Sequence, residues 1–190
     1  MTEKIDEQSP RTKARIAGIF YLLTIVTGAL ALFVNGPLRS ALLLGSTVCY
    51  IAVTVLFYGL FRPVNRSISV VAAVFSLVGC GLSILDFFHL VSSRLDPLVF
   101  FGAYCLLIGY LILRSTFLPR ILGVLMTLGG FGWLTFMSPA LSGYLSPYNM
   151  APGILGEAAL TIWLLAAGVN AERWNQQASV QPPNNRWRGR

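Results

Sequence analysis

The chain has 190 residues, of which 55% are hydrophobic and 11% are charged. Soluble globular domains usually carry about 25% charged residues, so this composition, with a mean hydropathy of +0.69, excludes an ordinary soluble domain and indicates a chain solvated by lipid. The formal net charge is +7. No basic stripe interleaved with aromatic residues lies outside the membrane flanks, so this charge does not predict a nucleic-acid partner.

The apolar residues occur in long blocks that are separated by proline-containing breaks. Each block is long enough to cross about 30 Å of hydrocarbon as a helix that rises about 1.5 Å per residue. The alternation of apolar and polar residues that marks a transmembrane β-strand is missing. We therefore predict an all-α transmembrane bundle. Its six predicted spans are Ile16–Val34, Ser40–Phe61, Ile68–Val91, Leu98–Leu113, Ile121–Leu141 and Ile154–Ala171.

The first span follows a basic segment that also resembles a targeting signal. Arg11, Lys13 and Arg15, the apolar run and then Ala29-Leu30-Ala31 have the layout of a secretory signal with its cleavage site. The apolar run continues through Leu32-Phe33-Val34, which makes it long enough to span the membrane. We therefore expect an uncleaved first helix, with a cleaved signal as the alternative.

The basic residues predict the orientation of the bundle, because cytoplasmic loops carry an excess of Lys and Arg. The turns after the second and fourth spans contain Arg62, Arg66, Arg114 and Arg120, and both ends of the chain are basic as well. The opposite side has only Arg39 and Arg94. We therefore expect both termini in the cytoplasm and a multi-pass membrane protein.

Ionisable residues inside two spans predict a polar site near the outer surface. Ser83, Asp86 and His89 share one face of the third span, with Asp86 about 27 Å from its cytoplasmic start. Glu157 lies one turn into the sixth span, and Tyr104 of the fourth span lies near the same level. Since charge is expensive in lipid, these five residues predict an outward-facing polar cleft that binds a small ligand.

Two other interpretations of these residues stay open. An Asp and a His three residues apart near a helix end commonly form an interfacial cap without a functional role. A catalytic pair is the second alternative, but general acid–base chemistry needs a positioned substrate, and nothing in the sequence indicates one.

Metal and cofactor sites are not predicted. The chain has a single His and no Cys-x-x-Cys spacing, so a zinc or haem site built by one chain lacks its ligands. The three cysteines, at positions 49, 80 and 105, lie inside spans and are interpreted as small packing residues.

The predicted domain organisation has three parts, which are a cytoplasmic segment 1–15, a transmembrane domain 16–171 and a disordered basic tail 172–190. The tail is polar and ends in Arg186-Trp187-Arg188-Gly189-Arg190, which predicts contact with anionic lipid headgroups. Ala72, Ser76 and Cys80 form a row of small residues that would let another helix approach closely. Membrane lipids and a membrane-protein partner, or a second copy of the chain, are therefore the expected partners.

Several stretches carry a family resemblance that covers nearly the whole chain apart from its tails. They are Ala14–Gly28, Phe57–Val71, Gly109–Leu125 and Gly156–Val169. The third is the most specific, through Tyr110, Arg114, Ser115, Pro119, Arg120 and Gly123. With these residues the chain resembles a bacterial membrane family known as domain of unknown function 4386. The resemblance implies a bacterial cytoplasmic-membrane protein with this topology, and it implies no activity.

The sequence indicates no reaction and no substrate. The favoured hypothesis is a non-enzymatic structural, accessory or small-ligand-binding membrane protein. The alternatives are a small-molecule or proton-coupled transporter and an enzyme that modifies a lipid or quinone.

Overall fold

The computed structural model describes residues 9–88, 90 and 96–180, and all regular structure in these ranges is helical. Six helical segments of this part of the chain are long and apolar enough to cross a membrane, which confirms the predicted all-α class and number of spans. The main helices are α1 (Pro10–Leu30), α2 (Pro37–Phe61), α3 (Arg66–Phe87), α4 (Pro97–Arg114), α5 (Arg120–Leu134) and α7 (Ala151–Ala166).

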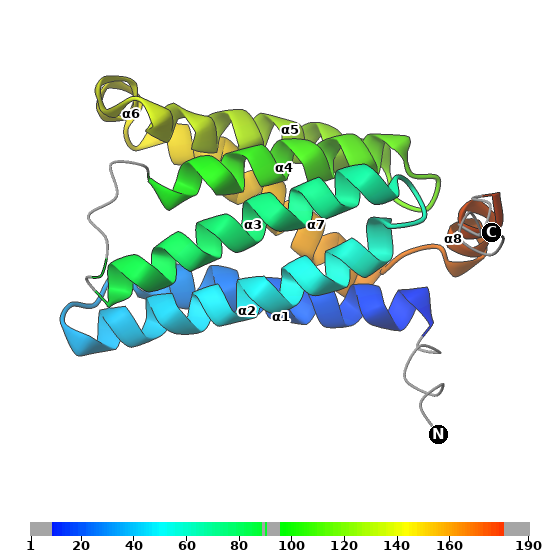
Figure 1. The fold of residues 1–190 in the computed structure, drawn as a ribbon, viewed down its shortest axis with the longest axis horizontal. Coiled ribbons are helices and arrows are strands. Elements are labelled where there is room, and N and C mark those ends of the chain that lie inside the picture. Colours follow the sequence, from blue (N-terminus) through cyan, green and yellow to red (C-terminus); the bar gives the residue numbers. More distant parts are fainter. Residues whose placement is uncertain (1–8, 89, 91–95, 181–190) are drawn as a thin grey trace, which may run out of the picture.

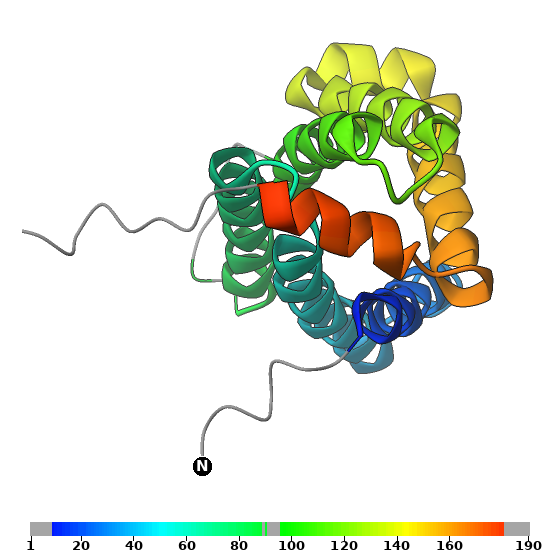
Figure 2. The same ribbon diagram turned by 90° about the vertical axis from the view of Figure 1, so that its right-hand side faces the viewer.

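These six helices form a closed ring. Each packs against its neighbours in the order α1, α2, α3, α4, α5, α7, and α7 closes the ring by packing on α1 as well as on α5. Figure 2 shows the ring from one end. In this order α3 and α7 lie on opposite sides of the ring, a placement that decides which polar residues meet.

The start of most helices follows from local sequence. Proline stands in the first turn of α1, α2, α4 and α7, where its missing N–H costs no hydrogen bond. Side chains cap other backbone donors. Asn65 Oδ1 accepts from the Ile68 N–H at 3.0 Å, and Asp96 Oδ1 accepts from the Leu98 N–H at 2.9 Å.

The outer end of the fifth span differs from the prediction. We expected one helix to Leu141, but α5 ends at Leu134 and is followed by the 3-10 helix η1 (Thr135–Met137). Ser138 is extended, as the residue before a proline usually is, and it caps the short helix α6 (Pro139–Leu145). The 3-10 helix η2 (Tyr148–Met150) then leads into α7, which begins at Ala151 rather than at Ile154.

Glycines let α4, α5 and α7 pack with their backbones almost in contact. A Cβ atom at Gly123 would lie 2.8 Å from the Gly109 oxygen, and one at Gly130 would lie 2.8 Å from the Gly102 oxygen. On the α7 side, a Cβ atom at Gly156 would lie 2.6 Å from the Leu125 oxygen. Small residues are the usual means of close helix packing in membranes, so α5 is held between α4 and α7.

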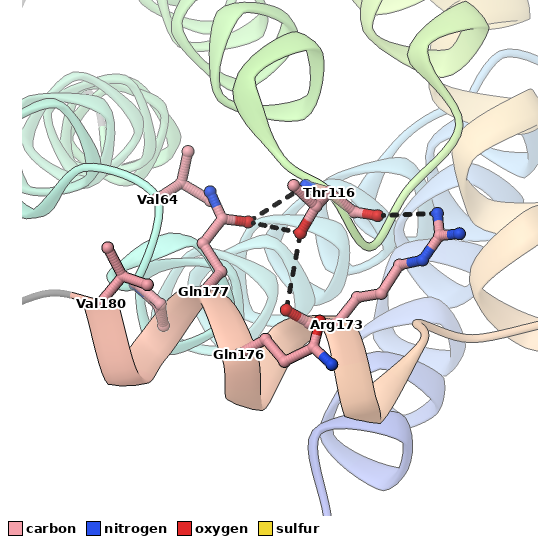
Figure 3. A pocket seen from close by; sticks show the side chains of 7 residues that line it. Val64, Thr116, Arg173, Gln176, Gln177 and Val180 are labelled. Atoms are coloured by element: carbon pink, nitrogen blue, oxygen red, sulfur yellow. Dashed lines mark hydrogen bonds between the residues drawn. The ribbon is translucent and has the colours of Figure 1, made fainter.

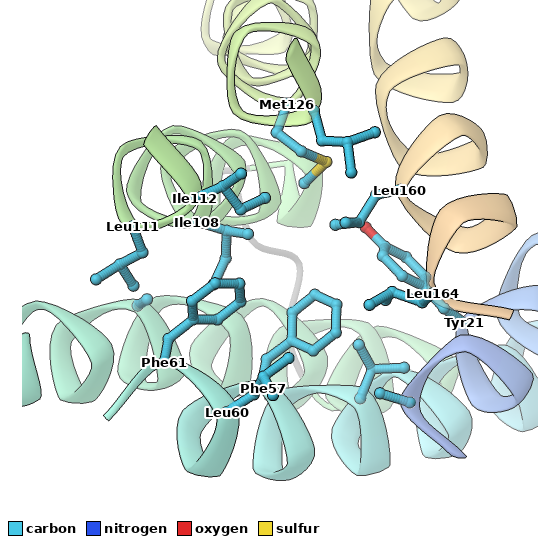
Figure 4. Packing of buried hydrophobic residues seen from close by; sticks show 14 of the residues in the cluster. Tyr21, Phe57, Leu60, Phe61, Ile108, Leu111, Ile112, Met126, Leu160 and Leu164 are labelled. Carbon is cyan, nitrogen blue, oxygen red and sulfur yellow. The ribbon is translucent and has the colours of Figure 1, made fainter. Parts of the chain in front are cut away.

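The interior of the ring is filled by aromatic and aliphatic side chains from all parts of the chain (Figure 4). Tyr21, Phe57 and Phe61 are at most 1% exposed and pack edge to face in sequence along the core. The small-residue row of α3 also points inward. Its Ser76 is 0% exposed, and its hydroxyl lies 2.6 Å from that of Thr54 on α2, so this row packs within the chain.

Helix α8 (Ala171–Val180) occupies part of the tail for which we predicted disorder. Figure 2 shows it crossing one end of the ring. The Trp174 indole N–H donates to the Leu60 oxygen at 2.8 Å, and the Gln177 side chain accepts from the Thr116 N–H at 3.1 Å. These long-range contacts stabilise a segment whose polar composition alone does not predict a helix. Residues 181–190 lie outside the described residues.

The glycine contacts generate a stability prediction. Gly123→Ala forces backbone atoms of α4 and α5 apart, and overpacking of this kind costs about 1–3 kcal/mol. Gly81→Ala on α3 is the matched control, because a Cβ atom there meets nothing within 4 Å and alanine favours the helix. Thermal unfolding in detergent should show a lower melting temperature for Gly123→Ala and no loss for Gly81→Ala. Equal melting temperatures would contradict the close packing of α4 and α5.

Candidate functional site

Glu157 lies in the second turn of α7 and reaches toward α4 and α5. Its Oε1 atom accepts a hydrogen bond from the Trp133 indole N–H of α5 at 3.1 Å. The Cys105 thiol of α4 donates to the same oxygen at 3.6 Å. Both donors are neutral groups, so the carboxylate is held in place without a counter-charge from either of them.

Two glycines of the sixth span explain how Trp133 reaches Glu157. A Cβ atom at Gly153 would overlap the Trp133 ring, and Gly156 allows the close approach of α5 described above. Gly153 lies one turn before Glu157 on the same helix. The indole therefore fits into a space that only glycine leaves open, and its N–H is directed at the carboxylate.

Three tyrosines from three other helices complete the polar cluster. Tyr21 of α1, Tyr50 of α2 and Tyr104 of α4 are 0%, 6% and 1% exposed. Tyr50 contacts the other two edge to face, with ring centroids 5.7 Å from Tyr21 and 5.8 Å from Tyr104. Each of the three lies within electrostatic range of Glu157. Figure 4 shows the Tyr21 hydroxyl pointing into the ring beside Leu160.

The hydroxyl oxygens of these three tyrosines are buried and form no hydrogen bond of normal geometry within the described protein. The Tyr21 hydroxyl faces Glu157 and Tyr50, and the Tyr104 hydroxyl faces Thr54. A buried polar atom that lacks a partner costs about 1–3 kcal/mol, and most tyrosines in membrane proteins avoid this cost by lying at the interface with water. Three such hydroxyls near one carboxylate are therefore an arrangement that packing alone does not favour.

The basic residues of the described ranges lie away from this cluster along the helices. They occupy the first two turns or the last turn of a helix, the turn after α2, or α8. Figure 1 shows the turns with Arg62, Arg66, Arg114 and Arg120 at the same end of the bundle as α8 and the start of α1. Arg114 Nε donates to the Tyr110 hydroxyl at 3.2 Å, as expected for an interfacial anchor.

Two grooves of the structure lie at that end. One is an open groove of about 590 Å³ between α8 and the turns at Val64 and Thr116 (Figure 3). Arg173 and Gln177 line it and bond to residues of the turn between α4 and α5. A second groove, of about 440 Å³, lies near Arg11 and Gly168.

The structure brings together only part of the predicted cleft. Glu157 and Tyr104 belong to the same interior cluster. Asp86 is exposed on α3, across the ring from α7, and the Ser83 hydroxyl donates to the Gly79 oxygen of its own helix at 3.0 Å. His89 lies outside the described residues. Similar predicted depths of Asp86 and Glu157 in the membrane do not make the two side chains neighbours, because depth does not specify the position of a helix around the ring.

Four members of the cluster were missed at the level of sequence. They are Tyr21, Tyr50, Cys105 and Trp133. The tyrosines could have been recognised from the sequence. The predicted spans contain Tyr21, Tyr50 and Tyr104, and tyrosine is less common inside spans than at the two membrane interfaces. The partnership of Trp133 with Glu157 depends on the close packing of α5 and α7 and had no local signal.

The part of the chain that carries most of this cluster is similar to a known protein family. Residues 95–168 match the family model described as Domain of unknown function (DUF4386). This match covers less than half of the chain, so it is a similarity over that segment. The predicted resemblance is confirmed. This DUF4386 segment includes α4, α5 and α7, and with them Tyr104, Cys105, Trp133 and Glu157.

One relative with similarity beyond this segment is a protein of Archaeoglobus fulgidus that is described as an uncharacterized protein. It is 28% identical over 124 residues, which cover 62% of this chain and 76% of the relative. The relative is archaeal, so the bacterial origin expected from the resemblance stays a prediction. No solved structure matches the chain.

The hydrogen bond between Trp133 and Glu157 generates a prediction for thermal stability. Trp133→Phe removes the indole donor and leaves an aromatic ring, and loss of a hydrogen bond to a charged group costs about 1.5–3 kcal/mol. Trp163→Phe is the matched control, because Trp163 lies on the same bundle and is 39% exposed. Thermal unfolding should show a clear loss for the first variant and little change for the second. Equal losses would argue against a specific role for the indole N–H.

Proposed function

We propose that this multi-pass membrane protein binds a small ligand at Glu157, inside the helix ring, and does so without catalysing a reaction. The observation that carries the proposal is the combination of a carboxylate held only by neutral donors with three buried hydroxyls that lack partners. Ionisable residues inside membrane proteins usually mark a functional site. A ligand would supply the missing hydrogen bonds.

Binding is favoured over catalysis because it requires nothing beyond these groups. The Cys105 thiol and the Glu157 carboxylate are in contact, but a nucleophile and a base are useful only with a substrate positioned beside them. Cys105 is 0% exposed, and the two grooves described above lie at the end of the bundle that carries α8. A lipid- or quinone-modifying activity therefore lacks a supporting contact.

The proposed site replaces the outward-facing cleft predicted from sequence. It lies in the interior and draws on α1, α2, α4, α5 and α7, instead of depending on Asp86 of α3. Five helices contribute to one cluster, so ligand binding would link the parts of the ring and stabilise its closure by α7.

We also propose that both termini face the cytoplasm and that the protein resides in the cytoplasmic membrane. The support is the positive-inside rule applied to Arg62, Arg66, Arg114 and Arg120. A reporter active only in the cytoplasm should be active when fused after Val180 and inactive when inserted at Gly143 between α5 and α7. The reverse pattern would overturn the orientation.

A thermal-shift screen of small cations, sugars, amides and carboxylates tests the proposed site on the full chain in detergent. Binding to the folded state raises its stability with ligand concentration. A hit should stabilise the wild type and Asp86→Asn but not Glu157→Gln, since both substitutions neutralise an acid and only one acid belongs to the cluster. A hit that stabilises Glu157→Gln as strongly as the wild type would place binding elsewhere and refute the proposed site.

A further inference from the structure

We infer that the ligand at Glu157 is a small ammonium-type cation, such as ammonium or a primary alkylammonium. The inference rests on the proposed function, and it adds the chemical class of the ligand. The charge, the remaining acceptor atoms and the aromatic surroundings of Glu157 each support it.

The charge of the cluster favours a cation. Glu157 contributes a carboxylate, whereas its two donors, Trp133 and Cys105, are neutral. Burying a carboxylate without a counter-charge is costly, and a positive ligand offsets that cost directly. An anion would be repelled, and a neutral ligand would leave the charge uncompensated.

The acceptor atoms favour a cation that carries N–H groups. The Trp133 and Cys105 donors both bond to Oε1 of Glu157. The hydroxyl oxygens of Tyr21, Tyr50 and Tyr104 add buried acceptors without partners. A primary ammonium group has three donors and no acceptor, so it satisfies several of these oxygens at once.

The aromatic rings favour the same ligand class. Tyr50 packs edge to face against Tyr21, Tyr104 and Phe101, with ring centroids 4.8–5.8 Å apart, and the Trp133 indole donates to the carboxylate. Aromatic rings attract organic and ammonium cations through their faces. The tyrosines are at most 6% exposed, so the ligand that we infer is small.

The experiment measures the apparent melting temperature of the full chain in lipid nanodiscs at fixed pH and constant chloride concentration. The probes are the chlorides of ammonium, methylammonium, potassium, sodium and tetramethylammonium, with acetamide as a neutral probe. We expect ammonium and methylammonium to raise the melting temperature of the wild type by a few degrees above sodium, with saturation. Potassium, which lacks N–H groups, should match sodium.

Three variants connect the shift to the cluster. Glu157→Gln should abolish the ammonium-dependent shift, and Asp86→Asn should retain it. Tyr104→Phe removes one hydroxyl that has no protein partner, so it should keep the unliganded melting temperature while reducing the shift by half or more. Because this variant retains the ring, it tests ligand contact even if Glu157→Gln fails to fold.

Each remaining outcome has a definite meaning. If potassium and sodium stabilise as well as ammonium through Glu157, or if acetamide alone does, the ammonium class is wrong while the binding site stands. If ammonium acts equally on the wild type, Glu157→Gln and Tyr104→Phe, the inference is overturned. If no probe here and no compound of the broader screen depends on Glu157, the proposed function fails as well.

Discussion

A carboxylate in the middle of a membrane-spanning helix has to be kept away from lipid, and the closure of the ring by α7 achieves this for Glu157. The helix packs on α5 and α1, and its glycines bring α5 close enough for Trp133 to donate to the carboxylate. If α7 packed less closely on α5, Glu157 would face hydrocarbon, where a charged group is energetically unfavourable. The arrangement of the whole interior cluster depends on this one contact.

The same closure explains why the interior is more polar at one level than the rest of the core. Beside the cluster the ring is filled by residues such as Phe57, Phe61 and Leu164 (Figure 4). Their side chains are apolar and need no hydrogen-bond partners. At the level of Glu157, three tyrosines turn their hydroxyls inward without partners in the described protein. These hydroxyls are the groups that the proposed ligand would satisfy.

The fold class and the spans could be predicted because lipid imposes them. A chain in hydrocarbon must satisfy its backbone hydrogen bonds within each helix, and the apolar blocks are therefore visible in the sequence. The order of helices around the ring has no such signal, since it depends on glycine contacts such as Gly109 with Gly123. For this reason the sequence did not indicate that α3, which carries Asp86, lies across the ring from α7, which carries Glu157.

Helix α8 shows the same limit at the end of the chain. Its polar composition predicted disorder, but Trp174 and Gln177 bond to α2 and to the turn after α4. These partners are more than a hundred and about sixty residues away in sequence, so no local pattern reveals them. The helix crosses the end of the ring that carries the basic turns (Figure 2).

The most direct test of this account measures the fluorescence of Trp133. The other tryptophans of the chain, at positions 163, 174 and 187, are replaced by phenylalanine. Fluorescence would be recorded in bilayers with and without brominated lipid, which quenches lipid-facing indoles. The account predicts that Trp133 is protected from bromine and that Glu157→Gln shifts its emission. Strong quenching of Trp133 by bromine, together with an emission wavelength that does not change in Glu157→Gln, would contradict a carboxylate enclosed by the ring.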